Sequence, residues 1–233
     1  MMTDGFLFRA GLLFITKYDE KLIKEGKRIH FNQAYLDDFN KNDVPKNNIV
    51  IFNFEADDLE VLYKIFSDEE VNRFLPWFPL KTISDAEQFF EKQFQSRYDA
   101  GQVYNYAVCL ERDNYPVGYI NVSMDAAYDF GYGLRKEFWH RGIITEAGKA
   151  VITQLKKDGI PYITATHDIN NPRSGRVMKR LGMKYQYSYE EQWQPKNFLV
   201  TFRMYQLNLD GNDSRIYREY WDRSTVHFVE PDL

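Results

Sequence analysis

The sequence predicts an α/β protein (α+β, with a mixed sheet), and three patterns along the chain support this prediction. Short apolar runs rich in β-branched and aromatic residues recur at the length of strands. Longer segments repeat apolar residues at helical spacing. Strand-like and helix-like runs alternate in the C-terminal half, which requires at least one parallel crossover. At 233 residues, the chain suits one large domain or one domain with terminal extensions.

The N-terminal half begins with an extension and continues as a strand followed by helices. Residues 1–48 run from an apolar start through a lysine-rich stretch to a polar segment, so we interpret them as an N-terminal extension. The run 49–54 predicts the first strand of the main domain. Of the two helices that follow, the second begins at the expected capping box of Ser84 and Glu87.

The middle of the chain predicts three strands and a long helix. The runs 104–110 and 117–124 are joined by turn-forming residues, which is typical of a hairpin. A third run, 128–134, leads towards a glycine-containing turn. From Ile143 the apolar residues recur at helical spacing, and the helix ends near Gly159.

The last part of the domain alternates strands and a helix. The run 162–167 predicts a strand, and Asn171 followed by Pro172 is typical of an N-cap and the first residue of a helix. Gly182 ends that helix. Two further strands are expected in 185–190 and 198–207.

These elements divide the chain into three parts. The N-terminal extension covers residues 1–48, the main domain covers 49–209, and a charged, aromatic C-terminal extension covers 210–233. The sequence assigns no role to either extension. The apolar and aromatic residues in them indicate subunit contacts, so a homodimer is one possible arrangement.

The composition excludes several classes of protein. A formal net charge of −4 and a pI near 5.7 give no basic excess for binding nucleic acid or an anionic membrane. The only cysteine, Cys109, cannot form an intrachain disulfide and lies in an apolar run, so we expect a small buried side chain in a cytoplasmic protein. The four histidines are scattered without zinc-ligand spacing, and we expect no metal site.

The segment 139–149, WHRGIITEAGK, has the features of an anion site. A helix N-terminus leaves backbone N–H groups without partners and carries partial positive charge. Gly142 permits close approach of a ligand, Arg141 adds charge, and Thr145 adds a hydroxyl in the first turn. Two interpretations stay open: a bound phosphate or pyrophosphate, or a glycine that only relieves a tight turn.

Four short motifs resemble those of one family. They are DFGYGL (129–134), WHRGIITEA (139–147), NPRS (171–174) and RLGM (180–183). In this order and spacing they resemble the GNAT N-acyltransferase superfamily, and specifically its RimJ/RimL-type branch of ribosomal-protein N-acetyltransferases. The resemblance extends over about 49–209. Three residues depart from the pattern: Ile144 replaces a small residue, which would crowd the turn, Asp129 is one methylene shorter than the usual glutamate, and Met183 replaces a phenylalanine.

The resemblance implies a fold and a cofactor site. The fold would be GNAT-like, with a central mixed, mostly antiparallel sheet and flanking helices. Acetyl-CoA would bind as co-substrate in a cleft where two neighbouring strands splay apart, with its pantetheine arm along a strand and its pyrophosphate on backbone N–H groups. The implied cofactor-binding residues are Leu134, Arg135, His140, Arg141, Gly142, Ile143, Ile144, Thr145 and Asn171.

The resemblance also implies catalytic residues. Asp129 takes the position of a proposed basic glutamate, and through a water it would accept the proton of the amine. Ser174 would protonate the departing thiolate. The alternatives are a structural carboxylate for Asp129 and a first-turn helix residue for Ser174. His167 is expected to be a structural histidine, and the aromatic cluster 74–79 either lines an acceptor pocket or packs between helices.

The implied activity is an acetyl-CoA-dependent N-acetyltransferase that transfers an acetyl group to a primary amine by direct attack on the thioester. The acceptor would be a small-molecule or peptide amine. A catalytically weak or inactive CoA-binding or sensory module on the same fold is the alternative. A third possibility is an interaction protein whose cleft is vestigial.

Overall fold

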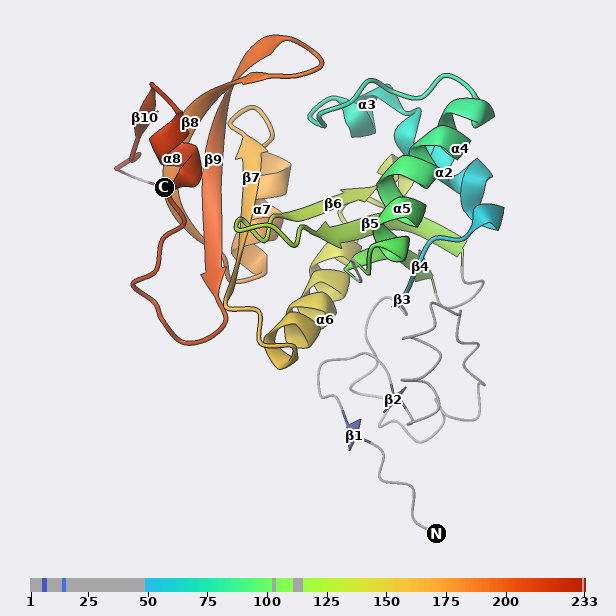
Figure 1. Cartoon of the computed structure of the whole chain (residues 1–233), viewed down its shortest axis with the longest axis horizontal. Coiled ribbons are helices and arrows are strands. Elements are labelled where there is room, and N and C mark those ends of the chain that lie inside the picture. The colour runs from blue at the N-terminus through green and yellow to red at the C-terminus, as the bar shows by residue number, and fades with distance from the viewer. Residues whose placement is uncertain (1–5, 8–13, 16–48, 102–103, 111–114, 232) are drawn as a thin grey trace.

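The computed structural model describes residues 6–7, 14–15, 49–101, 104–110, 115–231 and 233 (Figure 1). Near the N-terminus, β1 (Phe6–Leu7) pairs antiparallel with β2 (Phe14–Ile15). The other residues of the expected N-terminal extension lie outside the described residues, so its role stays a prediction. Within the described residues, no helix combines the length and the apolar character needed to cross a membrane.

Four antiparallel strands form the first sheet. In spatial order they are β3 (Ile49–Phe52), β4 (Asn105–Leu110), β5 (Tyr115–Val122) and β6 (Phe130–Leu134). The hairpin predicted between the second and third of these strands is confirmed by the pairing of β4 with β5. The connecting residues 111–114 lie outside the described residues.

Helices cover both faces of this sheet. One face carries η2 (Ala56–Asp58), α2 (Leu59–Phe66), α3 (Glu69–Asn72), α4 (Ile83–Phe90), the π-helical turn η3 (Glu91–Gln95) and α5 (Ser96–Asp99). The other face carries α6 (Ile143–Lys157). The strands alternate between these layers: Val50 and Cys109 pack with α2, whereas Ile49 and Val108 pack with α6. Cys109 is fully buried, as expected.

The capping box of α4 differs from the one expected. Thr82, not Ser84, is the N-cap: its hydroxyl accepts from the Asp85 N–H (3.1 Å), and the Asp85 carboxylate accepts from the Thr82 N–H (2.9 Å). Both residue pairs have the spacing of a capping box, so the local pattern alone does not distinguish them. The structure places Ser84 inside the helix.

The second sheet is also antiparallel. Its spatial order is β10 (His227–Phe228), β8 (Lys184–Trp193), β9 (Phe198–Asn208) and β7 (Tyr162–Asp168). The helix α7 (Pro172–Arg180) begins at the predicted N-cap, where the Asn171 side chain accepts from the Ser174 N–H. The two strands expected after that helix are confirmed as β8 and β9.

The two sheets meet where β6 and β7 run parallel. Among the described residues, the recorded bridge between these strands is Asp129 to Thr164. The Thr164 N–H donates to the Tyr128 carbonyl (3.3 Å), and the Thr164 hydroxyl donates to the Ala127 carbonyl (2.8 Å). The unit β6–α6–β7 is the predicted parallel crossover, and its strands separate beyond this bridge.

The C-terminal segment (residues 210–233) packs against the second sheet. Its helix α8 (Glu219–Arg223) covers β8, and its strand β10 pairs with β8 (Figure 1). The Tyr187 hydroxyl donates to the Tyr217 carbonyl (2.7 Å). The guanidinium of Arg203 donates twice to the Glu230 carboxylate (2.8 and 2.6 Å).

We predict that Glu230→Gln lowers the free energy of unfolding at pH 7 by about 1–3 kcal/mol, because it breaks the charge-assisted pair with Arg203. Hydrogen bonds from Arg203 lower the pKa of the Glu230 carboxyl. This contribution is therefore present above the unfolded-state pKa of about 4.3 and is lost as the pH falls through the lower folded-state pKa.

Urea denaturation of both proteins at pH 7 and pH 3 measures the effect. Asp222→Asn is the matched control, because it removes a 3.8 Å ion pair between exposed side chains and should change stability by less than about 0.5 kcal/mol. Equal losses in the two variants would contradict the prediction.

Candidate active site

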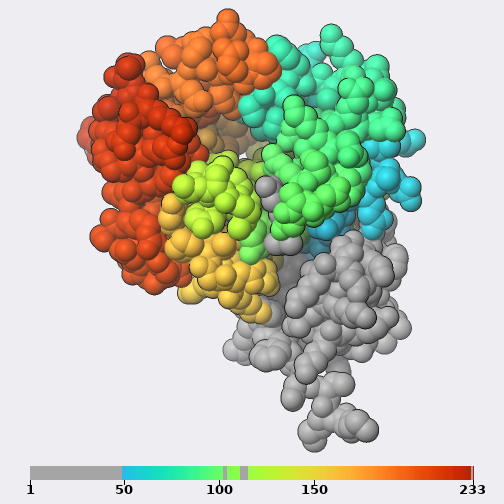
Figure 2. All heavy atoms as spheres, viewed as in Figure 1, coloured from blue at the N-terminus to red at the C-terminus, as the bar shows by residue number. Residues whose placement is uncertain are grey.

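A cavity with a volume of about 960 Å³ lies where the two sheets separate. This volume is at the upper end of the roughly 300–1,000 Å³ that small-molecule sites occupy. Its lining comes from the connection after α3, from β5 and β6, from the first turns of α6 and α7, and from β8, β9 and α8. Figure 2 shows a hollow between the C-terminal half and the helices over the first sheet.

The first turn of α6 borders this cavity with unpaired backbone donors. The N–H groups of Ile143, Ile144 and Thr145 have no recorded acceptor in the part of the chain that the structure describes. The N-cap is Gly142 at φ 81°, a left-handed conformation that favours glycine. A Cβ built there meets nothing within 4 Å, so the space above the turn is open. The geometry suits a phosphate group.

Most of the expected cofactor-binding residues line the cavity. These are Leu134, His140, Gly142, Ile143, Ile144, Thr145 and Asn171. The Ile144 side chain is only 6% exposed and packs in the core, and the crowding expected beside the pyrophosphate stays a prediction.

Arg135 and Arg141 are not among the lining residues. The Arg135 N–H donates to the Val117 carbonyl of β5 (2.9 Å), so it cannot also donate along the free side of β6. The guanidinium of Arg135 pairs with Glu137. The Arg141 guanidinium lies over the Phe138 ring, 5.5 Å from its centre. Strand alternation therefore turns the expected backbone contact at Arg135 away from the cavity.

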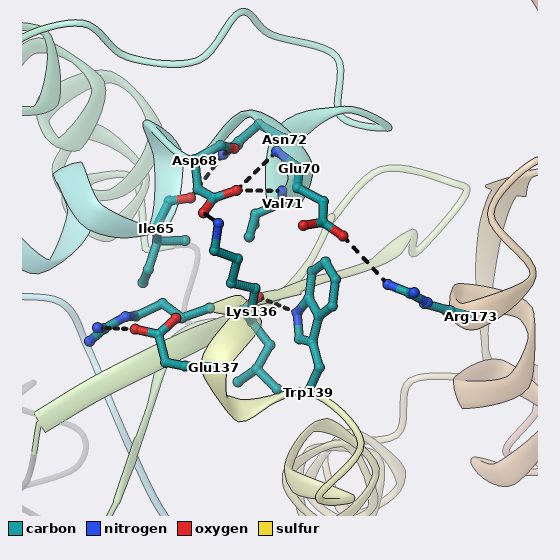
Figure 3. Close-up of polar contacts among 11 residues, drawn as sticks. Ile65, Asp68, Glu70, Val71, Asn72, Lys136, Glu137, Trp139 and Arg173 are labelled. Atoms are coloured by element: carbon teal, nitrogen blue, oxygen red, sulfur yellow. Dashed lines mark hydrogen bonds and ion pairs between the residues drawn. The ribbon is translucent and has the colours of Figure 1, made fainter.

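Contacts across the mouth of the cavity hold the turn after β6 (Figure 3). The Trp139 indole donates to the Leu134 carbonyl (2.7 Å), and the Arg173 guanidinium lies over the Trp139 ring at 5.1 Å. Arg173 also approaches Glu70 of α3 at 3.8 Å. These contacts link β6, α7 and α3 around the start of α6.

A second connection in Figure 3 fixes the short helix η4 (Lys136–Phe138) to α3. The Lys136 ammonium lies 3.0 Å from the Asp68 carboxylate. That carboxylate also accepts from the N–H groups of Glu70 (2.9 Å) and Val71 (3.1 Å), so it caps α3. The helix layer and the turn before α6 are thereby held together.

Ser174 faces Tyr132, a residue that the sequence analysis did not single out. The two hydroxyl oxygens are 2.7 Å apart, and the Tyr132 hydroxyl donates to the Ser174 carbonyl at 2.9 Å. Because a phenol has one proton, this arrangement directs the Ser174 hydroxyl proton at the Tyr132 oxygen. Tyr132 therefore positions Ser174, and both line the cavity. The sequence offered one signal for Tyr132: the alternation of side chains along the strand FGYGL (130–134) places it on the same face as Phe130 and Leu134.

Asp129 lies at the parallel bridge, where the sheets part, and lines the cavity. The Asp129 N–H donates to the Ser123 hydroxyl (2.8 Å), so this N–H is not available to bind a ligand. Burial and the nearby charge of Asp125 raise the pKa of the Asp129 carboxyl to about 7. A carboxylate that titrates near neutral pH can accept a proton from a reacting group.

Four aromatic side chains on β8, β9 and α8 also line the cavity, and we name them the aromatic row: Tyr189, Trp193, Phe202 and Tyr220. The sequence analysis did not identify them as site residues, because strand alternation gives a face but not its neighbours. Phe74 and Trp77 of the aromatic cluster 74–79 line the cavity as well, which was one of the two roles expected for that cluster.

His167 is buried, and its Nδ1 lies 2.8 Å from the Asp168 carbonyl. Burial lowers the pKa of its imidazole, which matches the structural histidine expected. Among the described residues, no group of three His, Cys, Asp or Glu side chains could hold a metal ion.

Known proteins resemble this chain in sequence and fold. The family model described as an acetyltransferase (GNAT) domain matches residues 48–184. The uncharacterized N-acetyltransferase YnaD of Bacillus subtilis (strain 168) is 26% identical over 145 residues, covering 60% of this chain and 82% of that protein.

Two solved structures share the fold. A GNAT-family acetyltransferase from Bacillus anthracis superposes with a TM-score of 0.60 at 23% identity, over 70% of this chain and 96% of that chain. The microcin C7 self-immunity acetyltransferase MccE, in complex with acetyl-CoA and AMP, gives 0.61 at 17% identity, over 70% and 93%. The sequence-based fold class is confirmed.

We predict that Asp129→Asn stabilises the fold at pH 8 by about 1–3 kcal/mol and has little effect at pH 3, where the carboxyl is protonated in both the folded and the unfolded chain. Because the folded-state pKa is raised from 3.8 to about 7, the carboxyl is favourable in the fold at low pH. Wild-type stability is lost as the pH rises from the unfolded-state pKa of about 3.9 to the folded-state pKa of about 7, because over this range the unfolded chain has released the proton that the folded chain still binds. Asparagine removes this loss.

Guanidinium denaturation at the two pH values measures the difference. Asp213→Asn, at an exposed aspartate of the C-terminal segment, is the control and should show no pH-dependent change. A gain for Asp129→Asn that is the same at both pH values would refute the raised pKa.

Proposed function

The chain belongs to the acetyltransferase (GNAT) family, and on that premise we propose that it is an acetyl-CoA-dependent N-acetyltransferase acting on a primary amine. One observation carries the proposal. Three backbone N–H groups without a recorded acceptor among the described residues open α6 beside a cavity of about 960 Å³. A helix N-terminus of this kind fits a pyrophosphate, and the separation of β6 from β7 leaves room for the rest of the coenzyme.

The residues present fit the coenzyme at both ends. His140 and the first turn of α6 would hold the pyrophosphate, with Gly142 leaving the approach open. Leu134, at the end of β6, and Asn171, at the start of α7, line the path between this turn and Asp129. Bound acetyl-CoA would supply the activated acetyl group as a thioester.

Asp129 is the proposed general base. An amine arrives mostly protonated and must lose a proton before its nitrogen can attack a carbonyl carbon. Burial beside the bridge gives the Asp129 carboxyl a pKa of about 7, so at neutral pH about half of the molecules can accept this proton, directly or through a water.

Ser174 is the proposed donor of the proton that the departing thiolate requires. Its hydroxyl is held by Tyr132 at 2.7 Å, and a buried phenol of raised pKa keeps its own proton at neutral pH. Rotation of the Tyr132 O–H from the Ser174 carbonyl towards the Ser174 hydroxyl oxygen would return the proton that Ser174 gives up, and solvent would then reprotonate the phenol, whose raised pKa favours the neutral form. Asn171 fixes the first turn that carries Ser174.

Finer assignments are part of the proposal. The motifs 129–134, 139–147 and 171–174 favour the RimJ/RimL-type branch of the family. The acceptor is a small-molecule or peptide amine, and we place the reaction in the cytoplasm. Homodimer formation stays a prediction, and sedimentation at high concentration tests it.

Release of CoA thiol from acetyl-CoA, measured with peptides, polyamines and aminoglycosides, tests the function. We expect turnover that depends on one class of amine. Coenzyme binding without turnover on any amine would instead support the CoA-binding module, and calorimetry without coenzyme binding would refute both.

We predict that Gly142→Glu weakens CoA binding at least 30-fold, because it places a negative charge beside the pyrophosphate. Gly142→Ala is the matched control. Both variants carry the same strain of about 1–2 kcal/mol for a side chain at positive φ, but alanine adds no charge and should cost tenfold or less. Calorimetric titration with CoA, with melting temperatures of both variants, decides between charge and strain.

We predict that Asp129→Asn lowers kcat at least 100-fold and leaves the dissociation constant for CoA within twofold, since it removes the base but keeps the shape. The wild-type kcat should rise with pH through a value near 7. Unchanged turnover in the variant would remove Asp129 from the mechanism.

A further inference from the structure

The aromatic row lies at the end of the cavity that the coenzyme site does not use. Its members come from β8, β9 and α8, so all four lie beyond residue 184, where the match to the family model ends. None of the four motifs that carry the family resemblance includes them either, so the resemblance assigns them no role. Their position beside Asp129 identifies this end of the cavity as the place where an acceptor would meet the base.

The rings of the row form a continuous surface. Tyr189 stacks on Tyr220 with ring centres 5.2 Å apart and an angle of 12° between the planes. Tyr189 is also 5.6 Å from Phe202, and Phe202 is 5.1 Å from Trp193. Such contacts keep the rings in fixed orientations.

Tyr220 is the member of the row whose hydroxyl is influenced most by the charge of Asp129. Burial, and then the negative charge of Asp129, raise the pKa of the Tyr220 phenol. Asp129 also contributes to the raised pKa of Tyr189. Both rings therefore lie near the carboxylate, and all three residues line the same cavity.

The C-terminal segment is fastened well enough to present Tyr220 in a fixed place. Glu230 binds Arg203 of β9 and accepts from the Ser188 hydroxyl of β8 (2.6 Å). The Ser224 hydroxyl donates to the Glu190 carbonyl (2.8 Å). These contacts follow α8 in the chain, and the hydrogen bond from the Tyr187 hydroxyl to the Tyr217 carbonyl (2.7 Å) holds the segment before it.

The turn between β8 and β9 begins beside Trp193 of the row and reaches towards the segment after α3 (Figure 1). The Lys196 ammonium in this turn donates to the carbonyls of Asn72 (2.8 Å) and Arg73 (3.1 Å). The turn between β8 and β9 therefore connects the two halves of the molecule at this end of the cavity. A bridge across this end of the cavity favours a small acceptor over a folded protein surface.

We propose that the aromatic row is the acceptor subsite, that it takes a small amine carried on an aromatic body, and that Tyr220 is its specificity-determining residue. This inference rests on the proposed function. An aromatic body gains edge or face contacts of about 0.5–1.5 kcal/mol per ring beyond its buried area, and an aliphatic chain does not. Glu191, on the same wall between Tyr189 and Trp193, adds a carboxylate that attracts the protonated amine.

The test compares 2-phenylethylamine with n-butylamine as acceptors for the full chain with acetyl-CoA. We expect wild-type kcat/KM to favour the aromatic amine at least tenfold. Tyr220→Ala should reduce this ratio at least fivefold through the aromatic amine alone, with the KM for acetyl-CoA unchanged within twofold. Tyr220→Phe should keep the ratio, because it keeps the ring.

Ile216→Ala, at an exposed side chain of the same segment, is the control for disturbance of the C-terminal segment and should behave as wild type. A wild-type preference for n-butylamine, for 1,4-diaminobutane or for a peptide amine would overturn the aromatic class. A ratio unchanged in Tyr220→Ala would overturn the role of Tyr220.

Calorimetry separates this inference from the proposed function. Binding of 2-phenylethylamine to the CoA-loaded protein reads the subsite without turnover, and Tyr220→Ala should weaken it at least fivefold. Absence of turnover with such binding intact would contradict the enzyme and support the subsite, whereas no measurable binding to wild type would overturn the subsite.

Discussion

The rest of the structure depends on the short length over which β6 and β7 pair. The recorded contact between these parallel strands among the described residues is the bridge from Asp129 to Thr164, and the two sheets separate beyond it. Each sheet satisfies its strands internally by antiparallel pairing, so neither loses its own hydrogen bonds when they part. The separation creates a cavity in a core that would otherwise be close-packed.

The elements around this fork supply complementary chemistry. The helix α6 connects the two diverging strands, so it begins at the cavity and its unpaired N–H groups lie there. The N-cap of α7 brings Ser174 to the opposite side, where Tyr132 of β6 holds it. Asp129 stands at the apex, where the surrounding protein makes its charge costly and therefore places its pKa near neutrality. A single topological feature thus brings together the groups that we propose as the anion site, the base and the acid.

The C-terminal segment completes the second sheet and the cavity wall together. Its aromatic side chains cover the face of β8 and β9 that α7 leaves open, and part of this cover, Tyr220, reaches the cavity. Packing and recognition are therefore coupled, because the contacts that hold α8 in place also fix the shape of one end of the cavity. Variation in this segment would alter the proposed acceptor end of the cavity and leave the proposed coenzyme end unchanged.

The sequence by itself determined the elements whose signals are local. The helical spacing from Ile143, the pair Asn171 and Pro172, and the alternating strands predicted segments that the structure contains, because short-range backbone preferences produce them. Even local signals failed where two solutions had equal spacing, as with Ser84 and Thr82. Only the tertiary structure decided that the Arg135 N–H, just after β6, donates to β5 and does not face the cavity. Only the tertiary structure brought Tyr132 to Ser174 and Tyr220 to Tyr189. Those contacts join residues far apart in the chain, and they arise from the packing of whole sheets, which no local pattern encodes.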